Sequence, residues 1–321
     1  MTDELNSTYD VIVVGGGAAG LNGALMLARA RRSVAVIDAG EPRNAPADGV
    51  HGLFAREGTP PAELVARGRE EVRGYGGHVI DARVSELART ADGFTVTLAD
   101  GRTARARRLL VTTGVVDELP DIPGLREHWG HDLVHCPYCH GYEVRDRPIG
   151  VLGLGPMGIH IAQLFRQWSP DITYFAHTAN PPNEEQAEQM AARGIRIVTG
   201  EIEAIESAEG HITGVRLTDG TVVPREILAA PTRMVARADL LPALGLNPVE
   251  HPSGAGEYIA ADPFGRTDIP GVWVAGNLTD VSAQVGAAAA GGAMAGAHIN
   301  ADLVTEDTRL AVEAHRSLAG V

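Results

Sequence analysis

Residues 9–20 read Tyr9-Asp10-Val11-Ile12-Val13-Val14-Gly15-Gly16-Gly17-Ala18-Ala19-Gly20. The first half is a short apolar, β-branched run, which is typical of a strand buried in a parallel sheet. The second half has the pattern Gly-x-Gly-x-x-Gly and leads into a helical stretch at 21–30. Glycines at this spacing permit a tight turn and let a pyrophosphate approach the helix N-terminus. The stretch therefore predicts a dinucleotide-binding strand–turn–helix.

The segment that follows supports this interpretation. Val34-Ala35-Val36-Ile37-Asp38 has the pattern of a second buried strand, and it ends in an acid eighteen residues after Gly20. A carboxylate at this place can accept hydrogen bonds from ribose hydroxyls. A glycine-rich turn alone is weak evidence, but the strand, the helix and the acid together indicate a complete dinucleotide-binding motif.

A second copy of the motif begins near residue 149. The strand-like Ile149–Leu152 precedes Gly153, Gly155 and Gly158, and a helical stretch and the strand-like 172–176 follow. Pro156 lies at an early helix position, where proline is tolerated. Two such motifs in one chain predict two Rossmann-like domains, for a flavin and for a nicotinamide or the remnant of a nicotinamide site.

The composition narrows the class of protein. The length of 321 residues suggests about two domains, and the apolar fraction of 44% is enough for a substantial core. A net charge of −14 argues against a nucleic-acid or membrane-surface partner. The Ala/Gly-rich run at 285–297 lacks the ~20 strongly apolar residues of a membrane span. The polar N-terminal residues show no signal-peptide pattern, so we expect a cytoplasmic enzyme.

The only two cysteines lie in His135-Cys136-Pro137-Tyr138-Cys139-His140, between the two motifs. Two thiols at Cys-x-x-Cys spacing with none to spare favour a redox-active disulfide. Cys-x-x-Cys-His is also the c-type haem attachment pattern, but that use requires export. A zinc site would need further ligands at suitable spacing, and none is clearly placed, so we expect no metal. A purely structural disulfide is disfavoured by the expected cytosolic setting.

The order of these motifs resembles the low-molecular-weight thioredoxin reductase family over essentially the whole chain. Further matches are Thr112-Thr113-Gly114 and the segment Ala275–Asp280, which reads Ala-Gly-Asn-x-x-Asp. The resemblance implies an α/β, three-layer ββα fold with two Rossmann-like domains. Residues 1–116 with 241–321 would form the FAD domain, and residues 117–240 would form the pyridine-nucleotide-type domain that carries the cysteines.

The resemblance also implies which residues bind FAD. They lie in the first glycine-rich loop, at the ends of strands and before the last helix, and are Gly15, Gly17, Ala18, Ala19, Gly20, Asp38, Val84, Gly114, Gly276, Asn277, Gln284 and Val285. The stretch Gly40–Asn44 stands in place of a Gly-Gln-Leu stretch of the reductases, and its Arg43 is a candidate cofactor contact.

The departures from the family concern the nicotinamide site. NADPH-using members carry an arginine-rich cluster for the 2′-phosphate after the second strand, whereas this chain has His177–Pro182, without arginine. The family's later glycine-containing turn becomes Ala230-Pro231-Thr232, and its Arg-Gln pair becomes Ala283-Gln284. The usual flavin-side aspartate becomes Asn277. Together these changes remove the charges that select NADPH.

His140 stands where the reductases have an acid/base aspartate. A histidine titrating near 6.5 can deprotonate a thiol whose pKa is near 8.5, so His140 is the candidate base beside Cys136 and Cys139. A histidine that only orients the loop is the alternative, and His135 is expected to be structural. The pattern resembles the dithiol oxidases of the holomycin and gliotoxin type. In that group the second cysteine, here Cys139, faces the flavin.

This resemblance implies an FAD-dependent enzyme that oxidises a small-molecule dithiol to a cyclic disulfide with O2 and yields H2O2. The main alternative is an NAD(P)H-dependent reductase of a thioredoxin-like protein or small disulfide, since NADH needs no phosphate clamp. A redox-sensing flavoprotein without turnover is a third class. Relatives form homodimers, and the apolar stretch at 303–318 predicts the same here.

Overall fold

The computed structural model describes residues 3–155 and 157–319, so Pro156 lies outside the described residues. The chain divides into two compact units. Unit 1 contains residues 1–45, 61–116 and 234–321, and unit 2 contains residues 46–60 and 117–233. The chain crosses between the units after residues 45, 60, 116 and 233. The last two crossings lie within β7 (Val115–Glu118) and β16 (Arg233–Ala236), which pair with each other.

These bounds differ from the expected domains at two segments. Residues 46–60 belong to unit 2, and within it His51 lies 3.6 Å from Glu143. Residues 234–240 belong to unit 1 because Ala236 and Ala238 are buried in its core. Neither packing partner is close in sequence, so no local pattern marks these segments.

Unit 1 is built on a seven-stranded sheet in the order β3-β2-β1-β6-β5-β4, with β19 paired to β6. Its elements are β1 (Thr8–Val14), α1 (Ala18–Arg29), β2 (Val34–Asp38), α2 (Pro61–Gly74), β3 (His78–Asp81), β4 (Val84–Thr90), β5 (Gly93–Leu98), β6 (Thr103–Val111), η2 (Pro242–Leu244), β17 (Val249–Glu250), β18 (Glu257–Tyr258), β19 (Val272–Val274), η3 (Gly276–Leu278) and α6 (Val285–Ala319).

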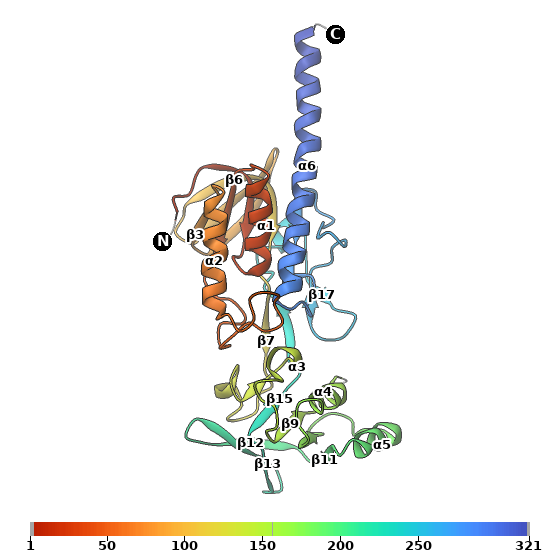
Figure 1. Ribbon diagram of the computed structural model, residues 1–321. Coiled ribbons are helices and arrows are strands. Elements are labelled where there is room, and N and C mark those ends of the chain that lie inside the picture. The colour runs from red at the N-terminus through yellow and green to blue at the C-terminus, as the bar shows by residue number, and fades with distance from the viewer. Residues whose placement is uncertain (1–2, 156, 320–321) are drawn as a thin grey trace. The chain divides into compact units, whose positions relative to one another are not determined.

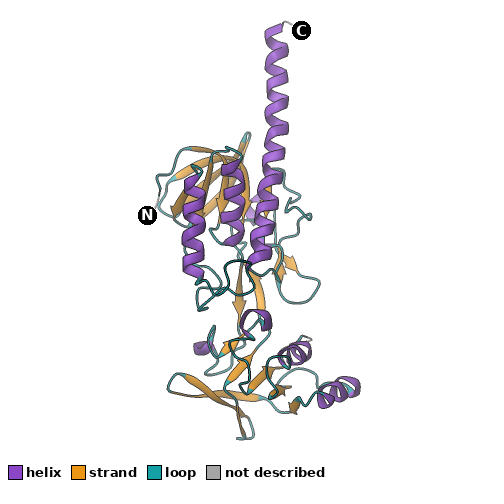
Figure 2. Ribbon diagram, in the orientation of Figure 1, coloured by secondary structure: helices purple, strands orange, loops and turns teal. Residues whose placement is uncertain are grey.

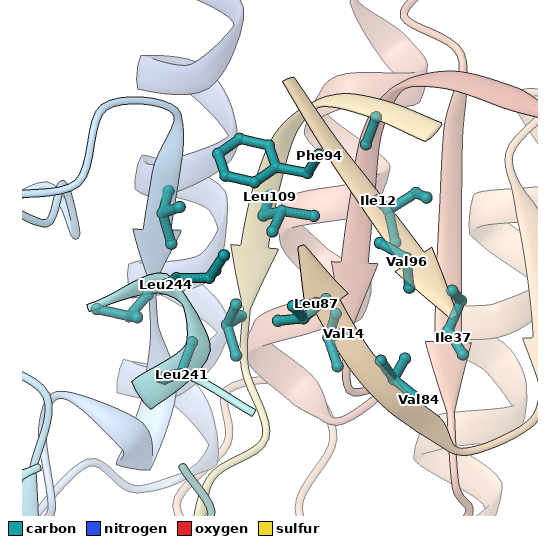
Figure 3. Close-up of a cluster of buried hydrophobic side chains, with 14 of the residues drawn as sticks. Ile12, Val14, Ile37, Val84, Leu87, Phe94, Val96, Leu109, Leu241 and Leu244 are labelled. Carbon is teal, nitrogen blue, oxygen red and sulfur yellow. The ribbon is translucent and has the colours of Figure 1, made fainter. Parts of the chain in front are cut away.

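Helices and strands of unit 1 form layers on this sheet. Figure 1 shows α1, α2 and α6 side by side, and α1 and α6 pack with Leu110 and Trp273 of the sheet in one buried cluster. On the other face of the parallel strands, the antiparallel end of the same sheet (β4 and β5) and η2 enclose a second cluster that contains Leu87, Phe94 and Leu241 (Figure 3). These layers agree with the predicted three-layer α/β class.

Unit 2 contains a five-stranded parallel sheet in the order β11-β10-β9-β15-β8 and a three-stranded antiparallel sheet β12-β13-β14. Figure 2 distinguishes these strands from the short helices of the unit. Its elements are η1 (Arg126–His128), β8 (Leu133–Val134), α3 (Pro137–His140), β9 (Ile149–Leu152), α4 (Gly158–Phe165), β10 (Ile172–Phe175), α5 (Glu184–Ala192), β11 (Arg196–Val198), β12 (Ile202–Ala208), β13 (His211–Leu217), β14 (Val222–Pro224) and β15 (Ile227–Ala229).

No helix among residues 3–155 and 157–319 is long and apolar enough to cross a membrane. The Ala/Gly-rich run that begins α6 instead packs closely on α1. A Cβ atom at Gly292 would lie 1.9 Å from the backbone oxygen of Ala19, so the two helix backbones touch at this point. The small residues of α6 therefore serve helix packing inside unit 1.

Candidate functional site

The first glycine-rich loop follows the carboxyl end of β1. Gly15 has φ +105°, and a Cβ there would lie 2.7 Å from the carbonyl oxygen of Thr112. Gly17 is the N-cap of α1 and makes no side-chain cap hydrogen bond, and a Cβ on Gly17 would meet no atom within 4 Å. The first turn of α1 thus presents backbone N–H groups beside open space, the arrangement that binds a pyrophosphate.

Other predicted FAD residues lie at the same edge of the unit 1 sheet. Asp38 ends β2 and accepts the Gly16 N–H at 3.0 Å, Gly114 follows β6 with φ +73°, and Gly276 follows β19 with φ +71°. Carboxyl ends of parallel strands are where doubly wound folds bind ligands. An uncapped helix N-terminus, glycines and a ribose-type acid on one edge fit FAD.

The remaining five predicted FAD residues lie in other segments of unit 1. The side chain of Val84 is buried in the core cluster drawn in Figure 3, so only its backbone could serve a cofactor. The Asn277 amide donates to the carbonyls of Asp280, Val281 and Ala283, which fixes the loop before α6. Arg43 is half-buried in the loop after β2. Gln284 immediately precedes α6, and Val285 is its first residue.

Arg237 is a neighbour of the predicted FAD residue Gly114 that no sequence motif indicated. Its backbone N–H donates to Gly114 O at 2.9 Å and its guanidinium donates to Glu41 O at 2.8 Å. Thr113 Oγ1 donates to the Arg237 carbonyl at 2.6 Å. Arg237 therefore ties the Gly114 turn to the loop after β2. These partners lie more than a hundred residues away, and no spacing signal could have linked them.

In unit 2, Cys136 and Cys139 form a disulfide with their Cα atoms 5.2 Å apart. Cys136 follows the edge strand β8 and is the N-cap of α3, and both cysteines are half-buried. The second glycine-rich loop follows β9, and the Ala230–Thr232 turn follows β15. Because β8, β15 and β9 run parallel, the disulfide and both turns lie at one edge of this sheet.

His140 ends α3, directly after the disulfide. Both of its ring nitrogens are buried, and neither has a hydrogen-bond partner among the described residues. Burial lowers the pKa of His140 below its usual value; the Glu143 carboxylate opposes this shift, and the imidazoles of His51 and His135 add to it. His140 is therefore a neutral imidazole at pH 7, with acceptor and donor capacity left for a ligand.

The segment 46–60 supplies a neighbour of this site that the sequence did not reveal. His51 Nδ1 lies 2.6 Å from Glu57, and its Nε2 lies 3.6 Å from Glu143. On the other flank, Thr232 Oγ1 donates to Asp117 at 2.6 Å and lies 3.3 Å from His135 Nδ1. His135 Nδ1 thus lies within hydrogen-bond distance of Thr232 and of the Ala230 carbonyl. Within the described residues, no group of three or more His, Cys, Asp or Glu side chains is arranged to hold a metal ion.

His177 follows β10, where NADPH enzymes place their 2′-phosphate clamp. Its Nδ1 accepts the Ile202 N–H at 2.9 Å. Burial lowers the pKa of His177, although the Glu201 carboxylate opposes this, so the ring is neutral at pH 7. A neutral ring gives no charge to bind a phosphate dianion. His177 is the only basic residue in the stretch 176–183, so this stretch offers no positive charge to a 2′-phosphate.

The fold and the two sites define a flavin-dependent disulfide oxidoreductase. Residues 9–295 match the family described as pyridine nucleotide-disulphide oxidoreductase, and the chain belongs to that family. It is 33% identical to "Thioredoxin reductase tcpT" of Claviceps purpurea, covering 93% of this chain and 96% of the relative. The predicted resemblance to thioredoxin reductase-like flavoproteins is confirmed, and FAD is the cofactor of the family.

Two solved structures agree over nearly the full length. The crystal structure of HlmI is 41% identical with a TM-score of 0.91, and the match covers 100% of both chains. An oxidoreductase from Agrobacterium tumefaciens is 35% identical with a TM-score of 0.86, covering 93% of this chain and 99% of that one. The predicted thioredoxin reductase-like fold is therefore confirmed.

Proposed function

We propose that this chain is an FAD-dependent dithiol oxidase, which closes an intramolecular disulfide in a small-molecule dithiol and uses O2 as the electron acceptor. The observation that carries the proposal is His140, a buried, neutral imidazole directly after the Cys136–Cys139 disulfide. Neither of its ring nitrogens has a hydrogen-bond partner among the described residues. A neutral imidazole is a base that can take the proton of a substrate thiol. The resemblance to the holomycin and gliotoxin type of oxidase agrees with this role.

The cysteine pair performs the exchange in two steps. A substrate thiolate attacks Cys136 Sγ, the Cys136–Cys139 bond breaks, and Cys139 leaves as a thiolate. The second substrate thiolate then attacks the substrate sulfur that is bonded to Cys136. This forms the cyclic disulfide and releases the Cys136 thiolate. The substrate loses two protons and two electrons, and His140 accepts the thiol protons in turn.

Bound FAD supplies the chemistry that takes the electron pair from the reduced cysteines and delivers it to O2, giving H2O2 with two protons. The residues that would hold it are the Gly15–Gly20 loop, Asp38, Gly114 and Gly276, with Arg43 and Gln284 as further candidates. The chain's own part is to keep the cysteine pair at a sheet edge and to keep His140 neutral.

The source of electrons separates this proposal from the alternative. The neutral His177 and the missing arginines support a dithiol rather than NADPH as the electron donor. The second glycine-rich loop, with Gly155 at φ +141°, favours the alternative of an NAD(P)H-dependent disulfide reductase. The printed name of the Claviceps relative, a thioredoxin reductase, points the same way.

Anaerobic mixing tests the two candidates directly. The FAD-loaded protein is mixed in turn with dithiothreitol, NADH and NADPH, and flavin absorbance is followed by stopped flow. The oxidase proposal predicts rapid bleaching by the dithiol and slow bleaching by both nicotinamides. Fast bleaching by NADPH that saturates at micromolar concentration would instead establish the reductase.

The proposal includes a cytoplasmic homodimer without nucleic-acid or membrane partners. Supporting observations are the exposed apolar side chains of Val304, Leu310 and Leu318 on the last part of α6. A second copy that covered these side chains would remove apolar surface from water. Light scattering at micromolar concentration should give twice the mass of one chain; a monomer would contradict the dimer.

A further inference from the structure

Arg69 lies at the edge of unit 1 where the ribose acid of the FAD site is found. From α2 its Nη2 donates to Asp38 Oδ2 at 2.5 Å, and its Nη1 donates to Asp81 Oδ1 at 2.8 Å. Asp38 and Asp81 are register partners at the ends of the parallel strands β2 and β3. Two neighbouring carboxylates repel each other, and the guanidinium between them offsets that repulsion.

The position of Asp38 is tightly constrained by these contacts. Its other oxygen, Oδ1, accepts the Gly16 N–H, and a Cβ on Gly16 would lie 2.7 Å from the Asp38 carboxyl carbon. The Asp38 side chain is only 14% exposed. A carboxylate has about four acceptor sites, so these two hydrogen bonds leave acceptor capacity for ribose hydroxyls.

Arg69 also has an unexplained donor. Its Nε–H is buried and has no hydrogen-bond partner among the described residues. Buried donors are nearly always satisfied, so an unpaired one indicates a missing acceptor. The adenosine half of FAD carries such acceptors in its ribose oxygens and ring nitrogens.

We infer that Arg69 is a positioning residue for the adenosine ribose of FAD, acting through Asp38. The guanidinium holds the Asp38 carboxylate against the glycine-rich loop, in the orientation that accepts the ribose hydroxyls. This role concerns cofactor binding alone. It therefore holds whether the enzyme oxidises dithiols or reduces disulfides, and its failure would leave the proposed function untouched.

The test measures FAD affinity rather than activity. The full-length chain is freed of flavin and titrated, by flavin fluorescence quenching, with FAD and with an FAD analogue whose adenosine ribose lacks the 2′- and 3′-hydroxyls. The variants are Arg69→Met, which keeps the aliphatic stem, and Arg69→Lys, which keeps the charge. Arg67→Met is the control, because Arg67 lies on the same helix and pairs only with Glu63 in the described structure.

The parent and Arg67→Met should bind the analogue at least ~10-fold more weakly than FAD, because the analogue lacks the hydroxyls that hydrogen-bond to the charged Asp38 carboxylate. Arg69→Met should bind FAD ~10-fold more weakly than the parent and should lose most of the analogue penalty, since the two changes are coupled. If Arg69→Met does not fold, the same comparison of FAD affinity with analogue affinity is made for Arg69→Lys. An undiminished analogue penalty in the Arg69 variant would overturn the inference, as would an equal loss in Arg67→Met.

Discussion

His140 is the residue on which the chemistry depends most. Replacing it by alanine removes the base beside the disulfide, so turnover of a dithiol at pH 7 should fall ~10²–10⁴-fold. Raising the pH toward the substrate thiol pKa, near 8.5, should recover part of the loss because solvent then supplies the thiolate. The exposed His160 is a suitable control, and its replacement by alanine should change nothing. Full activity of His140→Ala at pH 7 would mean that His140 only orients the loop.

The pH profile offers a second test of His140. A base works while it is unprotonated, so activity falls as the pH drops through its pKa. Burial lowers the pKa of His140, and the acidic limb of log kcat/KM should therefore lie below pH 6.5. An acidic limb above pH 6.5 that disappears in His140→Ala would show that His140 is the base but that its pKa is raised.

At the scale of single residues, the sequence predicted which residues belong to the candidate site better than it predicted which residues surround them. Cys136, Cys139 and His140 lie close together in the sequence, so their spacing alone suggested shared chemistry. The neighbours His51 and Glu143 come from segments about ninety residues apart, and no local pattern joins them. Asn277 was predicted beside the flavin from its motif, whereas its amide group also fixes the loop before α6, a contact that depends on tertiary geometry.

Helix α6 is the element whose packing makes the clearest prediction. At Gly292 a Cβ would lie 1.9 Å from the backbone oxygen of Ala19, and backbone cannot move aside cheaply. Gly292→Ala should therefore destabilise the protein by ~3 kcal/mol, as overpacking does. At Gly291 a Cβ meets no atom within 4 Å, so Gly291→Ala should stabilise α6 by ~0.5–1 kcal/mol through helix propensity. Thermal unfolding should give a lower Tm for Gly292→Ala and a higher Tm for Gly291→Ala than for the parent. Equal changes in Tm would contradict the close contact of α6 with α1 at Gly292.

Ion pairs attach α6 to the sheet of unit 1. Arg32 and Arg107 donate to Asp307, and these hydrogen bonds hold the pKa of Asp307 below its usual range. A lowered folded-state pKa contributes stability that is present above the unfolded value of ~3.9 and is lost as the pH falls through the folded value. Because Asp307 is solvent-screened, Asp307→Asn should lower stability at pH 7 by no more than ~1 kcal/mol.

The check on this prediction is the pH dependence of Tm. Asp307→Asn should unfold at lower temperature than the parent at pH 7, and the difference should shrink as the pH falls toward 2. Glu313→Gln is the matched control, since Glu313 pairs only with Arg309 on the same helix in the described structure. A difference in Tm that is the same at pH 7 and pH 2 would show that charge is not the cause.

Local sequence patterns predicted where strands and helices lie along the chain, but they did not predict which strands pair with each other. The strand pattern at 34–38 matches β2, and the helix expected from about Gln284 is α6. β5 pairs antiparallel with β4, yet both strands belong to the seven-stranded sheet and not to a separate ribbon. The reason is β6, whose nine residues pair in parallel with β1 and antiparallel with β5. Such shared pairing is a long-range property.

At the scale of the whole molecule, each unit has its predicted site at the carboxyl ends of parallel strands. In unit 1 this edge carries the predicted FAD residues, and in unit 2 it carries the disulfide and the second glycine-rich loop. The motif order predicted this division of labour. The electron donor could not be read from the motifs, because the second loop is intact while its charged partners are missing.

The most direct measurement of the central claim is the stoichiometry of oxygen uptake without any nicotinamide. The FAD-loaded protein is given dithiothreitol in air-saturated buffer, and O2 consumed, H2O2 formed and disulfide formed are measured against an enzyme-free blank. The account predicts one O2 and one H2O2 for each dithiol oxidised, and no uptake above the blank with Cys136→Ser. Absence of uptake with the dithiol, together with steady NADPH-driven reduction of a disulfide, would contradict it.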